Sequence, residues 1–175
     1  MAFRRRTSVR RAGTRKRAVW VNIPFGGVNF SETAGEQLLL LPEDWEASFT
    51  GLSNERAVLR AVVGEVIFAQ TVVGTAGNNL FWGLYMSGLG AATPVFTTTG
   101  MSTVSWLRTG VRAVTNSITN SQSMVLSNYA QQIDVKAKRK LDSSMKLSIV
   151  AQYGADAASP AGIMSGLLRF LVARD

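Results

Sequence analysis

Two neighbouring segments near the C-terminus alternate apolar and polar residues with a period of two, and this pattern restricts the local fold most strongly. The first runs from Ile133 to Leu141 and the second from Met145 to Tyr153, with an Asp-Ser-Ser turn between them. Successive side chains of a β-strand point to opposite faces, so the pattern predicts two strands joined by a turn, each with its apolar residues on one face. In the first strand, the predicted buried residues are Ile133, Val135, Ala137 and Leu141, and the predicted exposed residues are Asp134, Lys136, Lys138 and Lys140.

The rest of the chain is also expected to form strands. Short apolar segments rich in Val, Ile and Phe are separated by clusters of Gly, Pro and Asn, which is typical of β-structure with turns between the strands. About eight strands and no long helical pattern predict an all-β sandwich or barrel. The further expected strands are Ala18–Ile23, Glu36–Leu41, Arg56–Val73, Leu80–Met86 and Ile163–Ala173, with at most two short ones, Met101–Leu107 and Val111–Ile118, in a long polar connection from Ser87 to Asn128.

Residues that favour turns or end strands refine this outline at two places. Pro24 and the Gly26-Gly27 pair are expected to end the first strand, because proline cannot donate to a ladder and glycine favours turns. After Pro42, the acids Glu43, Asp44 and Glu46 predict a helical turn or a solvated loop.

The first seventeen residues carry all of the net charge of the protein. The chain has 19 Lys and Arg residues against 11 Asp and Glu residues, and its formal net charge is +8. The segment Met1–Arg17, called the arm below, holds eight of the bases and no acid, so residues 18–175 are neutral. With almost no apolar side chains the arm cannot offset the entropy of ordering, and we expect it to be disordered. Its cations are Arg4, Arg5, Arg6, Arg10, Arg11, Arg15, Lys16 and Arg17.

A polyanion is the partner that the chemistry of the arm favours. The planar guanidinium of arginine matches phosphate oxygens in pairs, and each neutralised phosphate releases a condensed counterion. Such contacts hold a nucleic acid without selecting its sequence. Three other interpretations stay open: an organellar transit peptide, a nuclear-import signal whose partner is the host import machinery, and a merely solvated tail.

The composition excludes several kinds of chemistry. The chain has no cysteine and no histidine, which removes disulfides, thiolate nucleophiles, the usual general base and nearly every zinc site. The acids that follow Pro42 lack the ligand spacing of a calcium loop. We therefore expect no catalytic residue, no metal and no cofactor, and we expect that the protein is not an enzyme. No apolar run reaches the roughly 20 residues that span a bilayer.

Inside the body, the strongest candidates for contact with nucleic acid are Lys136, Lys138 and Lys140. Alternate residues of a strand stand roughly 6–7 Å apart, close to the phosphate spacing of an extended chain. The alternative is an edge strand whose lysines prevent aggregation. The aromatics Trp20, Phe81, Trp82, Tyr85 and Phe170 are expected in the core, although Trp20 follows the arm directly and could stack on a base.

Four features follow one another along the chain. They are the Arg-rich N-terminus that runs into a Trp-bearing strand, Arg-Ala-Val-Leu-Arg-Ala-Val-Val-Gly-Glu at Arg56–Glu65, Leu-Phe-Trp-Gly-Leu at Leu80–Leu84, and Ile-Asp-Val-Lys-Ala-Lys-Arg-Lys-Leu at Ile133–Leu141. In this order they resemble the capsid proteins of small circular, Rep-encoding single-stranded DNA viruses of the circovirus-like and genomovirus-like range. The chain is short for that group, with 175 residues.

The resemblance implies a single jelly roll, an eight-stranded antiparallel β-sandwich, over residues 18–175. It also implies self-assembly into a small icosahedral shell, with the arm of residues 1–17 packaging single-stranded DNA. The expected location is the virion, with the host nucleus during assembly. The alternative is a cellular nucleic-acid-binding β-domain of ribosomal or chromatin-associated type with a basic extension.

Overall fold

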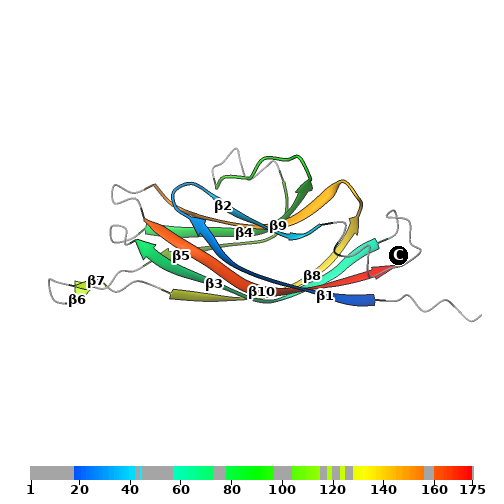
Figure 1. Cartoon of the computed structure of the whole chain (residues 1–175), viewed down its shortest axis with the longest axis horizontal. Helices are drawn as coiled ribbons and strands as arrows, with labels where there is room; N and C mark the ends of the chain where they lie inside the picture. The colour runs from blue at the N-terminus through cyan, green and yellow to red at the C-terminus, as the bar shows by residue number, and fades with distance from the viewer. Residues whose placement is uncertain are drawn as a thin grey trace, which may run out of the picture.

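The computed structural model describes residues 18–41, 44, 57–72, 78–96, 104–114, 118–119, 123–124, 128–155 and 160–174. The predicted arm lies outside these residues, and so do Glu43 and Glu46 of the predicted acidic turn. The described part of the chain is built from strands in two stacked sheets (Figure 1). It contains no helix that is long and apolar enough to cross a membrane.

The lower layer in Figure 1 is a sheet of four antiparallel strands with the last strand of the chain next to the first. Its order is β1 (Ala18–Phe30), β10 (Ala161–Arg174), β3 (Ala57–Val72) and β8 (Asn128–Leu141). We call this the arm sheet, because the arm leads directly into β1.

The upper layer is a second antiparallel sheet, called the lid sheet below. Its order is β2 (Gly35–Leu40), β9 (Met145–Tyr153), β4 (Asn78–Gly88) and β5 (Ser105–Val114), and a small hairpin joins β6 (Ile118–Thr119) to β7 (Ser123–Met124). Of the connections between the eight long strands, only β4–β5 stays within one sheet. Eight antiparallel strands in this order form a jelly roll, so the all-β sandwich is confirmed.

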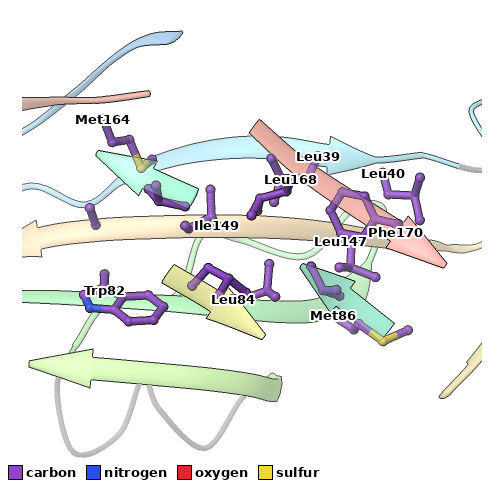
Figure 2. Close-up of a cluster of buried hydrophobic side chains, with 14 of the residues drawn as sticks. Leu39, Leu40, Trp82, Leu84, Met86, Leu147, Ile149, Met164, Leu168 and Phe170 are labelled. Atoms are coloured by element: carbon purple, nitrogen blue, oxygen red, sulfur yellow. The ribbon is translucent and has the colours of Figure 1, made fainter. Parts of the chain in front are cut away.

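The core lies between the inner faces of the two sheets. Alternate residues of β10 and β9 point into it, and Leu168, Phe170 and Ile149 have no exposed surface. Figure 2 shows Leu168 and Phe170 of one sheet packed against Ile149, Trp82 and Leu84 of the other. Each fully buried side chain of this size contributes roughly 1.5–3 kcal/mol, so the core is the main stabilising element of the sandwich.

The first strand does not end at Pro24 and Gly26-Gly27, as the sequence predicted, but continues to Phe30. Pro24 is tolerated because β1 is an edge strand, where its missing N–H leaves no ladder bond unmade. The two glycines lie where the pairing with β10 shifts register between Phe25 and Val28, and Gly27 has a φ of 73°. A bulge therefore absorbs the turn signal without ending the strand.

The long polar connection also holds more structure than predicted. In place of two short strands, β5 runs without a break from Ser105 to Val114. Gly110 interrupts the apolar pattern for a packing reason, because a Cβ atom there would lie 2.4 Å from Nε1 of Trp82. The strand β8 likewise begins at Asn128, five residues before the alternation becomes clear. The predicted turn after Pro42 is partly described: the Leu41 N–H donates to Oδ2 of Asp44 at 2.8 Å.

One glycine in the arm sheet permits a close backbone approach. Gly64 of β3 has a φ of 150°, and a Cβ atom at this position would lie 2.1 Å from the carbonyl oxygen of Leu167 on β10. Any side chain must therefore push apart the two central strands of the sheet.

We expect Gly64→Ala to lower the free energy of unfolding by about 2–4 kcal/mol, because it combines an unfavourable φ with a backbone clash. Urea denaturation measures the change. Gly90→Ala is the control, since no atom lies within 4 Å of its Cβ position, and it should stay within about 0.5 kcal/mol of wild type. Equal stability of the two variants would contradict the close approach.

Candidate nucleic-acid interface

All four predicted binding residues of the body lie in the arm sheet. Trp20 is on β1, at one edge of this sheet, and Lys136, Lys138 and Lys140 are on β8, at the other edge. The cations of the arm, from Arg4 to Arg17, lie outside the described residues, so their role stays a prediction.

The strand register brings the start of the first strand and the lysines to the same end of the sheet. One row across the four strands joins Ala18, Ala173, Val58 and Lys140. The next row on the same face joins Trp20, Leu171, Ala61 and Lys136. With strands about 4.8 Å apart, Ala18 and Lys140 are separated by roughly 14 Å. The arm therefore joins the sheet at the same end as the lysines, on the opposite edge.

The predicted alternation in β8 is confirmed. Ile133 and Leu141 are buried, Val135 and Ala137 are half-buried, and the three lysines are exposed. The strand is also an edge strand, as the aggregation-protection hypothesis requires. An edge position is equally compatible with contact to nucleic acid, so the contact of Lys136, Lys138 and Lys140 with nucleic acid stays a prediction.

A fourth cation, Arg139, joins the lysines although strict alternation would place it on the buried face. It pairs with Leu59 of β3, which has no exposed surface, yet Arg139 itself is exposed. The register between β3 and β8 shifts between Leu59 and Ala61, and this irregularity re-aims the side chains at the end of β8. The sequence did hold a signal, because the uninterrupted run Lys138-Arg139-Lys140 cannot fit a strand with one apolar face.

The expectation that Trp20 lies in the core is wrong. Its side chain is 39% exposed on the outer face of the arm sheet, and the guanidinium carbon of Arg169 lies 5.0 Å from the ring centroid. Trp82 and Phe170 are in the core as predicted. The exposed ring of Trp20, with a cation beside it, is suited to stacking on a base.

Phe81 and Tyr85 face away from the core, on the outer face of the lid sheet. Residues 89–96, which follow β4, fold back over this face. The centroid of the Phe96 ring lies 5.8 Å from that of Phe81 and 5.5 Å from that of Trp106. The backbone N–H of Phe96 donates to Oε1 of Gln152 at 2.9 Å. Tyr85 is fully buried, because this segment closes over the outer side of the sheet.

Beneath the segment lies a polar cluster that the sequence did not reveal. The carboxylate of Glu36 on β2 accepts hydrogen bonds from Nζ of Lys146 at 2.8 Å, from the Tyr85 hydroxyl at 2.6 Å, and from the Thr93 hydroxyl. The side chains of Lys146 and Glu36 are only 7% and 14% exposed. Lys146 holds a polar position in the alternation of β9, yet its side chain is buried. It shares the Glu36 carboxylate with Thr93 of the covering segment.

These contacts fix the charge of Glu36. Burial alone would raise its pKa, but the hydrogen bonds from Lys146, Thr93 and Tyr85 outweigh burial and lower the pKa from 4.5 to about 2. Burial, followed by the hydrogen bond to this carboxylate, raises the pKa of Tyr85 far above 10. The cluster is thus an ion pair held by neutral donors, and every carboxylate contact ties β2 to another element.

No group of three His, Cys, Asp or Glu side chains that could hold a metal occurs in the described ranges. What the described surface offers is positive charge on β8 at one edge of the arm sheet, and an exposed aromatic ring on β1 at the other edge, two residues from where the arm joins at Ala18. This arrangement can bind phosphates and stack bases.

We expect Glu36→Gln to lower the free energy of unfolding by about 3–5 kcal/mol at neutral pH, because the Lys146 ammonium stays buried without a counter-charge. Adding Lys146→Met removes that charge, and the double variant should recover at least about 1 kcal/mol. Chemical denaturation of wild type and both variants measures this. A double variant less stable than Glu36→Gln alone would contradict the argument.

The polar cluster should also make stability depend on acid. Because the folded pKa of Glu36 is below its ordinary value, its contribution is fully present above pH 4.5 and is lost as the pH falls to about 2. The difference in unfolding free energy between wild type and Glu36→Gln should therefore shrink across this window. A difference that stays constant from pH 7 to pH 2.5 would disprove this assignment.

No protein-family model and no curated protein matches the chain. Among solved structures, the chain is similar to a chain in the structure of Cocksfoot mottle virus. The two share 12% identity over 100% of this chain and 91% of that chain, with a TM-score of 0.41. The chain is also similar to infectious bursal disease virus Gt strain (15% identity, 92% and 33% of the chains, TM-score 0.27) and to the VP2 subviral particle of that virus (13%, 91% and 37%, 0.31). The chain spans about a third of the length of the bursal disease virus chains. The strand order, and not these alignments, identifies the jelly roll.

Proposed function

We propose that this protein is a viral coat protein, which assembles in many copies into an icosahedral shell and packages single-stranded DNA through its arm. The observation that carries the proposal is the division of charge along a jelly-roll chain. Eight cations and no acid directly precede β1, and the residues that follow are neutral. Jelly rolls are a common architecture of viral capsid domains.

The register supports a cationic surface that extends beyond the arm. The arm enters at Ala18, whose row across the sheet ends at Lys140. Lys136, Lys138 and Arg139 lie on the same strand, and Arg169 lies beside Trp20. A nucleic acid held by the arm would reach these side chains without a change in the fold. The role of the body residues would be secondary to that of the eight arm cations.

The neutral body supports contact between copies. Ile67 and Leu167 are 42% and 47% exposed, and their register places both on the outer face of the arm sheet. On the lid sheet, Val111 of the edge strand β5 is 64% exposed. Exposed apolar side chains of this size favour association, and a body without net charge does not oppose it by repulsion.

Electron microscopy and light scattering of the purified full-length chain, combined with nuclease treatment, test the proposal. We expect shells that contain nuclease-protected nucleic acid. Digestion of the released nucleic acid by DNase but not by RNase would support DNA as the cargo. A monomer or small oligomer that does not bind nucleic acid at low salt would overturn the proposal. A monomer that does bind would favour the cellular nucleic-acid-binding domain.

Neutralising the arm should separate assembly from packaging. Replacing its eight Arg and Lys residues by Gln removes the phosphate contacts, so binding weakens at low salt and the fall of affinity with rising salt becomes shallower. We expect at least about a thousandfold weaker binding of single-stranded DNA at low salt, with an unchanged circular dichroism spectrum.

The matched control is an arm of the same composition in scrambled order. Because phosphate contacts carry no sequence information, the scrambled arm should bind and package as the wild type does. Loss of packaging in the scrambled variant would mean that the arm is recognised as a sequence, which contradicts an electrostatic role.

A further inference from the structure

A cavity of about 320 Å³ opens at the end of the sandwich, between the end of β8, the end of β4 and the start of β5. Its volume is at the lower limit of small-molecule sites, roughly 300–1,000 Å³. The side chains that line it come from four strands: Met86, Ser87, Gly88, Ser105, Arg139, Lys140 and Met145.

The sheet register explains why the cavity exists. Met86 pairs with Leu147 and Ser105, and Met145 pairs with Gly88, so both methionines lie where the core ends. A Cβ atom at Gly88 would have no contact closer than 3.9 Å, so this wall is open. On the other side, the irregular end of β8 brings Arg139 to the rim next to Lys140.

The lining combines two kinds of chemistry. Met86 and Met145 give a polarisable apolar floor, which suits the face or edge of an aromatic ring. Arg139 and Lys140 add two positive charges, and the lining named above contains no acid. The nearest acid in sequence is Asp142, whose Oδ1 accepts from the N–H of Ser144 at 2.8 Å and from its hydroxyl at 2.5 Å. Its carboxylate is therefore engaged within the β8–β9 turn.

We propose that this cavity binds one nucleotide, with the phosphate on Arg139 and Lys140 and the base against Met86 and Met145. An anion joined to a flat apolar group is the ligand that matches both parts of the lining. The choice of a nucleotide rests on the proposed function. Lys140 shares its row across the sheet with Ala18, where the arm would bring bound nucleic acid to the body. The guanidinium can hold two phosphate oxygens, and the ammonium adds a point charge.

Equilibrium binding of deoxyadenosine monophosphate to the full-length chain, with deoxyadenosine and inorganic phosphate as separate probes, tests the site. The monophosphate should bind at least about tenfold more tightly than either fragment, since only it uses both parts of the lining. Equal affinity for inorganic phosphate and the monophosphate would overturn a nucleotide site and leave an anion site only.

Paired variants distinguish this cavity from general surface charge. Arg139→Gln with Lys140→Gln should weaken binding of the monophosphate by at least about tenfold, because it removes two charge-assisted contacts. Arg108→Gln with Arg112→Gln removes the same charge from β5, outside the cavity, and should change binding less than about twofold. The swap Arg139→Lys with Lys140→Arg keeps the charge and should retain most of the affinity. Equal losses in both Gln pairs would overturn the proposal.

Cross-linking of particles loaded with bromodeoxyuridine-substituted single-stranded DNA separates this inference from the proposed function. Ultraviolet irradiation followed by mass spectrometry should place cross-links on the peptides that contain Met86 or Met145. Loaded particles without such cross-links would overturn the nucleotide site and leave the coat-protein proposal intact. A chain that never forms particles but binds the monophosphate would overturn the coat-protein proposal and leave the nucleotide site intact.

Discussion

The structure depends on the pairing of the last strand between the first and the third. β10 forms an antiparallel ladder with β1 on one side and with β3 on the other, over nearly its whole length. Its inward side chains, including Leu168, Phe170 and Val172, have no exposed surface. The arm sheet therefore cannot close until the end of the chain is present. Contacts over such long sequence separations are typical of slow-folding β-proteins.

The two faces of the lid sheet are stabilised by different forces. The inner face is apolar and packs on the arm sheet, whereas the outer face combines an ion pair with aromatic packing under residues 89–96. Both charges of the Glu36–Lys146 pair are largely removed from water, so the segment above them matters to their energy. The polar cluster thus fastens residues 89–96, which have no regular secondary structure, to the sheet below them.

How much the sequence predicted varies with how local the signal is. The alternation gave the apolar face of each strand and the bounds of β9, because both depend only on neighbouring residues. It missed the first five residues of β8 and the burial of both faces of β9. The sequence did not predict that β1 continues past Gly27 or that β5 is one unbroken strand. A bulge at Gly27 and the contact of the Trp82 ring with Gly110 are tertiary effects, which neighbouring residues do not reveal. For the same reason the sequence marked Lys136, Lys138 and Lys140 as exposed, but not Arg139 at the rim of a cavity or Lys146 under a covering segment. The role of the arm was predicted from its composition alone, and the arm lies outside the described residues.

The neighbouring positions of Ala18 and Ala173 have a practical consequence. These residues are partners at the end of the β1–β10 ladder, and the C-terminus in Figure 1 lies at the end of the sheet where β1 begins. A peptide or enzyme joined after β10 would leave the domain alongside the arm. If the arm lines the interior of a shell, such a passenger would be enclosed with it, and a tag intended for display on the outside belongs instead in a loop at the opposite end of the sandwich.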